Sequence, residues 1–355
     1  MQSAILLLAA AGAASAQLAT VSEPAISAIN AAAATAVPSS PVSNVQGLAF
    51  KNFYQVWLEN IDYVYASDDS NQHYLASYVI TLNYFCAVAH PSEPNYASTA
   101  AGDQFAMDND NFIQIPANVS TIVDLLDTKG ISWGEYQESL PYAGFQGFNY
   151  SNQQTYANDY VRKHNPLILF DNVAGNASRA SQIKNFSSLW SDVENNTLPQ
   201  YSFITPNMTN DGHDTNISFS GTWTLLSCSP SMKVAHYSVI ASLSANWELP
   251  SLGRWDCGAN LLSLVADKVK YVNYDVDMTN ANLNTSYPGP LSTNKYSSAW
   301  PIPLTDGAQC SGANTVLHTV QQTYHGLKPT YNYTSPIPYD TVSGTSVGIK
   351  YSRKG

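Results

Sequence analysis

Charged side chains are scarce in this chain. They make up 12% of its 355 residues, and the 15 Lys and Arg residues are outnumbered by 26 Asp and Glu residues. The net charge of -11 excludes the basic footprint that nucleic-acid-binding proteins need, and no basic stripe occurs anywhere. Apolar runs are short, and none reaches the roughly 18 residues of a membrane-spanning helix. We therefore expect neither a nucleic-acid partner nor stable membrane association.

Cysteine is also rare, with four residues in the whole chain. Cys86, Cys228, Cys257 and Cys310 could pair in three ways in an oxidising compartment. A zinc site is the weaker interpretation, because no two of them stand at ligand spacing. We favour a bond between Cys257 and Cys310 and leave the other two unassigned.

The N-terminal residues and the many Asn, Ser and Thr residues indicate export. Residues 1–16 resemble a secretory signal, with an apolar run followed by small residues, and 17–43 form an Ala-, Ser- and Pro-rich leader that we expect to be processed or loosely ordered. Sequons for N-linked glycans occur at Asn118, Asn149, Asn176, Asn185, Asn195, Asn207, Asn216, Asn284 and Asn332. We expect a secreted glycoprotein, either extracellular or associated with the cell wall.

Strand and helix signals alternate through residues 44–270, which we predict to be one catalytic domain. Short apolar runs predict strands at 53–58, 166–170 and 201–205 and a further strand that starts with 131–133. The segments between and after them predict helices at 120–129, 178–195, 237–247 and 256–268. This alternation is typical of a wound α/β fold with a parallel sheet. Residues 271–355 are predicted to add short strands and loops packed on the same domain.

Polar residues follow two of these predicted strands. Glu59 comes directly after the strand at 53–58, and Asp211, His213 and Asp214 come after the strand at 201–205. The carboxyl edge of a parallel sheet is where ligands bind. A carboxylate there can hold a divalent cation, which can activate a hydroxyl such as that of Ser92 to attack phosphorus. Each cluster alone would be an ordinary turn, so the prediction depends on their combination.

Several motifs resemble, in order, those of the fungal secreted acid phosphatases, in the phosphoesterase family that also contains bacterial phospholipases C. The matching stretches are Trp57-Leu58-Glu59-Asn60, His90-Pro91-Ser92-Glu93-Pro94-Asn95-Tyr96, Ser132-Trp133-Gly134-Glu135-Tyr136, Arg162-Lys163-His164-Asn165-Pro166, Thr205-Pro206-Asn207-Met208, Asp211-Gly212-His213-Asp214, His236-Tyr237-Ser238 and Gly253-Arg254-Trp255-Asp256. The family fold resembles alkaline phosphatase. The resemblance therefore implies an α/β three-layer sandwich with a mostly parallel central sheet.

The same resemblance implies roles for individual residues. Ser92 would be the nucleophile, with His213 and His236 as further catalytic groups. A divalent metal ion would be held by Glu59, Asn60, Asp211 and Asp214, and substrate would contact Asn60, Asn95 and His164. Structural roles without a catalytic function stay open for some of these residues. Asp211 to Asp214 could be a surface loop, His164 could be structural, and His236 could cap a helix.

The chain departs from the family after Asp214. Members carry an apolar strand ending in an acidic pair before the late His-Tyr-Ser motif, whereas here no carboxylate occurs between Asp214 and Glu248. A deletion is the simplest description, arising from a gene-model error or a real loss. We therefore expect the sheet to lack one core strand and the activity to be impaired.

The expected function is hydrolysis of small phosphate monoesters by a metal-assisted serine nucleophile. One alternative is a phospholipase C-type phosphodiesterase, although the polar, Tyr- and Asn-rich segment at 142–156 does not form an apolar, lipid-facing surface. The other alternative is a catalytically inactive secreted glycoprotein.

Overall fold

The computed structural model describes residues 19–77, 87–227, 236–273, 287–307 and 310–331. Its centre is a sheet of four strands, ordered β1 (Phe53–Val56), β6 (Tyr201–Thr205), β2 (Trp133–Gln137) and β5 (Ile183–Asn185). All three neighbouring pairs are parallel, with Phe53 and Trp133 both aligned with Tyr201. The carboxyl ends of these strands therefore lie along one edge of the sheet.

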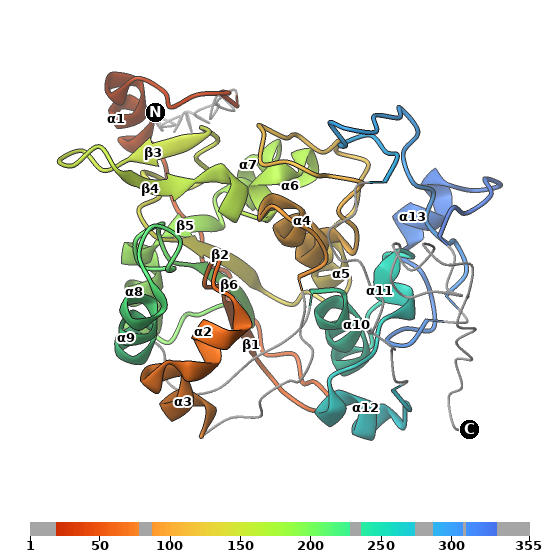
Figure 1. Ribbon diagram of the computed structural model, residues 1–355. Helices are drawn as coiled ribbons and strands as arrows, with labels where there is room; N and C mark the ends of the chain where they lie inside the picture. The colour runs from red at the N-terminus through yellow and green to blue at the C-terminus, as the bar shows by residue number, and fades with distance from the viewer. Residues whose placement is uncertain (1–18, 78–86, 228–235, 274–286, 308–309, 332–355) are drawn as a thin grey trace, which may run out of the picture.

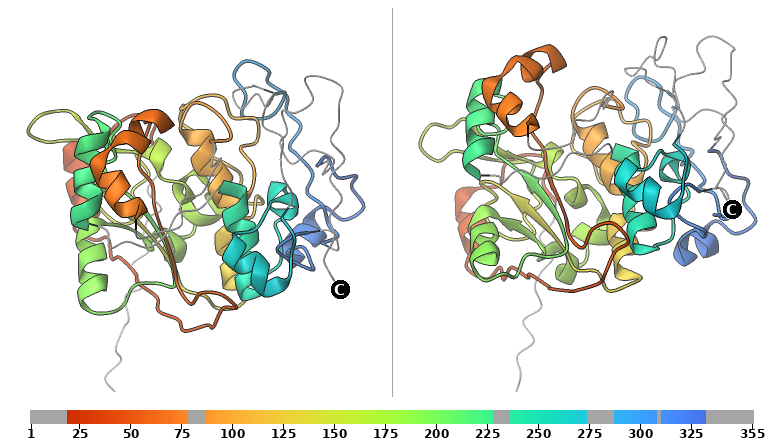
Figure 2. Two further views of the ribbon diagram at one scale, coloured as in Figure 1. Left: turned by 60° about the horizontal axis from the view of Figure 1, so that its bottom comes forward. Right: turned by 90° about the horizontal axis from the view of Figure 1, so that it is seen from below.

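Helices cover both faces of this sheet, which gives the three-layer arrangement that the family resemblance implied (Figure 1). Helices α8 and α9 lie on one side, and α4, α5 and α10 lie on the other, as the view from below also shows (Figure 2). The α-helices are α1 (Ile26–Ala33), α2 (Tyr63–Asp68), α3 (Ser70–Ala76), α4 (Glu93–Ala101), α5 (Ile122–Asp127), α6 (Asp171–Ala174), α7 (Ala177–Ala180), α8 (Phe186–Glu194), α9 (Ile217–Ser227), α10 (His236–Trp247), α11 (Trp255–Gly258), α12 (Ser263–Val269) and α13 (His318–Thr323). Two 3₁₀ turns, η1 (Arg162–His164) and η2 (Leu167–Leu169), and a hairpin of β3 (Asn149–Ser151) with β4 (Asn158–Val161) complete the described elements.

Strand β2 shows why both faces are covered. All five of its residues are buried, and successive side chains of a strand point to opposite faces. Trp133 packs in the main core with Tyr201 and with Trp247 of α10. Tyr136 packs on the other face with Phe186 of α8. A strand buried on both sides is the signature of the inner strands of a parallel α/β sheet.

Several predicted elements are confirmed, with small shifts in their bounds. Helix α5 begins after Thr121 rather than Ser120, because Thr121 and Asp124 form a capping box, and Gly130 follows the helix with a φ of 63°. Helix α10 matches the helix predicted at 237–247, and β1 and β6 match their predicted runs.

Other predicted elements are wrong. The strand expected at 166–170 is the 3₁₀ turn η2, whose Phe170 makes only an isolated bridge to Ile115. The helix expected at 178–195 is divided into α7, β5 and α8, and the one expected at 256–268 is divided into α11 and α12. Short apolar runs of this kind suit a buried strand or a buried turn equally well, so the sequence alone does not separate them.

The described part of the predicted leader contacts the core. Ile29 of α1 is buried in the main hydrophobic cluster. Ser43 donates a hydrogen bond to Gln200 at 2.6 Å, and Ser40 donates one to Asp192 at 2.6 Å. Residues 19–43 therefore pack on the domain that follows, rather than lying loosely beside it. Their processing stays a prediction.

A disulfide and a hydrogen bond connect the C-terminal segment to the domain at 44–270. The predicted disulfide between Cys257 and Cys310 is confirmed, whereas Cys86 and Cys228 lie outside the described residues. Tyr331 donates a hydrogen bond to the buried Asp103. The described parts of 271–355 contain α13 and isolated bridges such as Gly289 with Tyr296, in place of the short strands expected there. None of the described helices has the length and apolarity to cross a membrane.

Candidate active site

The loops that follow β1 and β6 meet at the carboxyl edge of the sheet. The backbone N–H of Glu59, just beyond β1, donates a hydrogen bond to the carbonyl oxygen of Asp211 at 2.8 Å. The two polar clusters predicted from separate strands therefore lie side by side. Glu59 is 8% exposed and Asp211 is fully buried, so both carboxylates are largely withdrawn from solvent.

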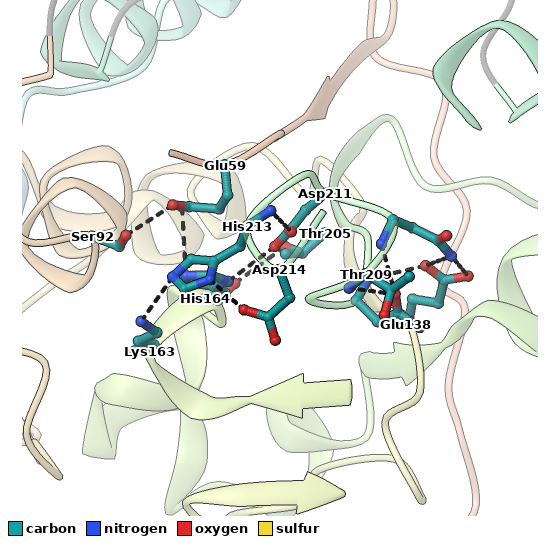
Figure 3. Close-up of polar contacts among 12 residues, drawn as sticks. Glu59, Ser92, Glu138, Lys163, His164, Thr205, Thr209, Asp211, His213 and Asp214 are labelled. Atoms are coloured by element: carbon teal, nitrogen blue, oxygen red, sulfur yellow. Dashed lines mark hydrogen bonds and ion pairs between the residues drawn. The ribbon is translucent and has the colours of Figure 1, made fainter. Parts of the chain in front are cut away.

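Ser92 lies against the first of these carboxylates. Its hydroxyl donates a hydrogen bond to Oε2 of Glu59 at 2.8 Å (Figure 3). Ser92 is the N-cap residue of α4, a helix whose residues are all buried. The helix thus presents the serine to the sheet edge from a rigid support, and the contact joins two residues that are 33 positions apart in the sequence.

His164, the last residue of η1, lies between the two carboxylates. Its Nε2 is 3.6 Å from Oε1 of Glu59, and its Nδ1 is 3.3 Å from Oδ2 of Asp211. The ring stacks on Tyr96 with centroids 5.1 Å apart. Its carbonyl oxygen accepts a hydrogen bond from the Thr205 hydroxyl at 3.2 Å. Ser92, Glu59, His164 and Asp211 therefore form a continuous row of polar contacts.

The turn from Asp211 to Asp214 positions His213 beside this row. The backbone N–H of His213 donates to Oδ1 of Asp211 at 2.7 Å, and His213 Nδ1 lies 2.8 Å from Oδ1 of Asp214. Gly212 has a φ of 98°, and a Cβ there would approach the Ser220 hydroxyl to 3.0 Å. Glycine is therefore required for this tight turn.

A second group of polar side chains lies on the more open side of His213. Nζ of Lys163 lies 3.5 Å from Nε2 of His213 and 3.0 Å from Oδ2 of Asp110. The other oxygen of Asp110 accepts a hydrogen bond from the backbone N–H of Glu93 at 2.9 Å, next to Ser92. Asp110 therefore links Lys163 to Glu93, the residue that follows Ser92.

Burial changes the acidity of the carboxyl groups at this edge. The pKa of Asp211 is raised by desolvation, which outweighs the opposing effect of His164. The pKa of Glu93 is raised well above its usual value, first by burial and then by the charge of Asp110, against the lowering effects of Arg162 and Lys163. Protonation is therefore easier at these two sites than on an exposed acid.

Two predicted substrate contacts have different surroundings. Asn60 is exposed and has a φ of 52°, a left-handed conformation that asparagine tolerates well. Asn95 binds the loop before Ser92: its Oδ1 accepts from Val88 at 2.8 Å, and its Nδ2 donates to the carbonyl of Ala89 at 2.8 Å. The amide of Asn95 therefore holds the turn that carries the serine, and a direct contact with substrate stays a prediction.

His236 begins α10 and is buried beneath the site. Its ring packs on Trp57 with centroids 4.6 Å apart, and Trp57 in turn lies 4.6 Å from Tyr96, which stacks on His164. Burial lowers the pKa of His236 to about 3, so its imidazole is neutral at mildly acid pH. Its catalytic role stays a prediction.

Three residues of this constellation were not singled out from the sequence. Lys163 and Glu93 lie inside motifs that did attract notice, next to His164 and Ser92 respectively. Asp110 lies in a polar loop that resembles many surface turns. No signal in the sequence could have paired Asp110 with Lys163, because that contact depends on how the loop folds back over α4.

The residues predicted as metal ligands do not form a complete set. Among the described residues, no three His, Cys, Asp or Glu side chains are arranged to hold a metal ion. Glu59 and Asp211 both face His164, and Asp214 faces His213. A divalent metal ion stays a prediction, and the donors present do not fit it without further ligands.

Comparison with known proteins identifies a family for this chain. Residues 47–233, more than half of the chain, match the phosphoesterase family. The chain belongs to the phosphoesterase family. It is 54% identical to an acid phosphatase of Aspergillus fumigatus, over 98% of this chain and 89% of that protein. It is 51% identical to an acid phosphatase of Aspergillus niger, over 99% and 96%, and 50% identical to a phosphate-repressible acid phosphatase of Penicillium chrysogenum, over 89% and 88%.

These phosphoesterase alignments are longer than the chain itself. The alignment with the Aspergillus fumigatus protein spans 398 positions, whereas 98% of the 355 residues is about 348, so about 50 positions have no residue from this chain. For the Aspergillus niger protein, 99% of the chain is about 351 residues within 403 positions, which leaves about 52. Both relatives therefore carry sequence that this chain lacks.

Proposed function

We propose that this chain is a secreted acid phosphatase in which Ser92 attacks phosphate monoesters. The observation that carries the proposal is the 2.8 Å hydrogen bond from the Ser92 hydroxyl to Glu59, at the ligand-binding edge of a parallel sheet. The phosphoesterase family match and the acid phosphatase relatives support hydrolysis of phosphoric esters.

In the first step the Ser92 oxygen bonds to phosphorus and passes its proton to Glu59. The ester P–O bond breaks, and its electron pair stays on the alcohol oxygen, which takes a proton from His213. In the second step water bonds to phosphorus and returns a proton to His213. The bond between phosphorus and the Ser92 oxygen breaks, that oxygen recovers its proton from Glu59, and orthophosphate leaves. A residue within hydrogen-bonding distance of the nucleophile is what such a proton transfer requires.

His164 and Asp211 support this chemistry by positioning Glu59. His164 lies within 3.6 Å of Glu59 and within 3.3 Å of Asp211, and it is 2% exposed. An imidazole in this position fixes the orientation of the Glu59 carboxylate and limits the access of water. His164 lies at the carboxyl edge of the sheet, so it can also contact substrate.

We further propose that the chain lacks one core strand and turns over slowly. The support is threefold: about 50 alignment positions without a counterpart, an incomplete set of metal donors among the described residues, and β1 at the end of the described four-stranded sheet. The predicted position of the loss, between Trp223 and His236, is largely outside the described residues. A strand that ends in two acidic residues there would supply further oxygen ligands for a divalent cation.

Secretion and N-glycosylation are part of the same proposal. The confirmed disulfide is typical of an oxidising compartment, and the apolar N-terminal run resembles an export signal. Among the described sequons, Asn118, Asn176, Asn195 and Asn216 are exposed and accessible to a glycan.

The test uses purified protein and a chromogenic aryl phosphate. The chain as written is expected to turn over at least about 100-fold more slowly than a version into which the corresponding segment of the Aspergillus niger relative is inserted. In the restored protein, Ser92→Ala should lower kcat by about 1000-fold or more, whereas Ser67→Ala, which alters a half-buried serine on α2, should have no effect. Rapid turnover by the chain as written would refute the proposed loss, and full activity of Ser92→Ala would refute the nucleophile.

A further inference from the structure

Lys163 is a partly open cation at the edge of the candidate site. Its side chain is 19% exposed, and its Nζ lies 3.0 Å from Oδ2 of Asp110. The same atom lies 3.5 Å from Nε2 of His213 (Figure 3). The position follows from η1, which places Lys163 directly before His164. Neighbouring residues of this turn therefore point to opposite halves of the site: His164 to the buried carboxylates and Lys163 to the open side.

Asp110 connects this lysine to the nucleophile. One carboxylate oxygen of Asp110 accepts the Glu93 N–H at 2.9 Å, and the other contacts Lys163 at 3.0 Å. Glu93 is the first residue of α4, and Ser92 is its N-cap. A single carboxylate thus holds the ammonium group and the residue next to the serine in a fixed relation.

Helix α4 cannot itself supply the donors that a phosphate group needs. The first N–H of the helix, from Glu93, is taken by Asp110, and the next residue is Pro94, which has no N–H. A bound phosphate also lies close to the carboxylates of Glu59, Asp211 and Asp214, which repel it. A side-chain cation is therefore needed to offset the repulsion.

The other cations that have partners in the described part of the chain are engaged elsewhere. Arg162 is buried and donates to the carbonyl oxygens of Gln146, Ile113 and Ile168. Lys184 is fully buried against Asp192. Lys129 and Arg179 form ion pairs with Glu248 and with Asp124 and Asp127.

We propose that the ammonium group of Lys163 binds the phosphate group of substrate and product, with Asp110 as its positioning residue. This inference rests on the proposed phosphatase function and adds the group that recognises the substrate anion. Charge-assisted contacts from a lysine to phosphate oxygens are among the stronger polar interactions in proteins. His213, 3.5 Å from Lys163, then lies on the side where the ester oxygen leaves.

The test is orthophosphate binding to the full chain, measured by isothermal titration calorimetry. Lys163→Met removes the charge and keeps most of the apolar stem, Lys163→Arg keeps the charge, and Lys129→Met removes an equivalent surface charge far from the site. We expect Lys163→Met to weaken orthophosphate binding by about tenfold or more, Lys163→Arg to stay within about threefold of the unmodified chain, and Lys129→Met to bind unchanged. In the version with the restored segment, Lys163→Met should raise KM by more than it lowers kcat.

The outcomes separate this inference from the proposed function. If the unmodified chain binds orthophosphate and Lys163→Met binds it equally well, Lys163 is not the phosphate-binding cation, although the phosphatase proposal stands. If neither the unmodified chain nor the version with the restored segment binds orthophosphate, the Lys163 proposal is contradicted, whereas the phosphatase proposal is decided separately by aryl phosphate turnover of the restored version. Thermal melting of each variant identifies a folding defect, and equal loss of binding in Lys163→Met and Lys163→Arg would assign Lys163 a structural role instead.

Discussion

The two halves of the candidate site differ in how far they are withdrawn from water. Glu59, His164 and Asp211 are 8%, 2% and 0% exposed. On the other side, the side chains of Lys163 and Asp110 are 19% and 24% exposed, and those of His213 and Asp214 are 22% and 40% exposed. In the buried half, Glu59 and Asp211 follow β1 and β6, and His164 ends η1. In the open half, Lys163 also belongs to η1, Asp110 lies in a loop, and His213 and Asp214 lie in the turn that begins at Asp211.

This difference indicates a division of roles. In the buried half a broken contact leaves a desolvated polar group without a partner, which costs about 1 to 3 kcal/mol or more for a charged group. In the open half water replaces a lost partner, so contacts there contribute little to stability. We therefore expect the buried half to fix the nucleophile and the open half to bind and release the phosphate group.

The largest expected difference between the halves is in paired Asp→Asn variants. Asp211→Asn weakens contacts to His164 Nδ1 at 3.3 Å and to the N–H of His213 at 2.7 Å. It should lower the free energy of unfolding by about 1.5 to 3 kcal/mol. Asp214→Asn, whose side chain is 40% exposed, should change it by less than about 0.5 kcal/mol. Chemical denaturation of both variants measures this, and equal destabilisation would remove the distinction between the halves.

A smaller effect is expected from the loop that carries Ser92. Asn95 is 8% exposed and bonds to Val88, Ala89 and Pro91. Asn95→Ala should destabilise the protein by about 1 to 2 kcal/mol and lower kcat, because the serine is no longer held against Glu59. Asn71→Ala, which removes a hydrogen bond to the Thr222 hydroxyl of α9, serves as the control. A change in KM alone would instead indicate that Asn95 contacts substrate.

The pH dependence of stability provides a further test, because the sheet beneath the site contains a buried acid, Glu135. Burial raises the pKa of Glu135 from its usual value near 4.5 to about 8, against the lowering effect of its hydrogen bonds with Gln137 and Leu167. A carboxyl group whose pKa is raised in the folded state favours folding most when protonated. Its contribution is therefore complete below about pH 4.5 and is lost as the pH rises to about 8.

The measurement for this prediction is the thermal midpoint of the chain and of Glu135→Gln between pH 5 and pH 8. The midpoint of the unmodified chain should fall on this rise in pH, and that of Glu135→Gln should fall less, because the amide does not ionise. Burial also raises the pKa of Asp103, Glu138 and Asp256, so part of the fall should persist in the variant. Parallel curves for the two proteins would show that Glu135 does not titrate in this range.

Much of the buried half could be predicted from the sequence. Glu59 and Asp211 each follow an apolar run that ends a strand, and parallel strands bring such ends to one edge. Ser92 and His164 were identified through motifs rather than through periodicity. The position of His164 between the two carboxylates could not be predicted, because it depends on the turn η1, which follows the hairpin of β3 and β4.

The open half and the irregular elements were harder to predict. Leu167–Leu169 looked like a strand because it is short and apolar, but it is the 3₁₀ turn η2. It closely follows η1, the turn that contains Arg162 and His164. Asn95 was predicted to contact substrate, which stays a prediction; its bonds to the loop backbone could not be predicted. Hydrogen bonds to the backbone leave no signal in side-chain patterns, so the sequence does not reveal contacts of this kind.

The central claim is that the Ser92 hydroxyl, held by Glu59, accepts the phosphoryl group. The most direct measurement is acid quenching of the protein during turnover of an aryl phosphate, followed by peptide mass spectrometry. The account predicts a phosphoryl group on the peptide that contains Ser92, and none in Ser92→Ala. A phosphoryl group on His164 or His213, with Ser92 unmodified, would contradict it.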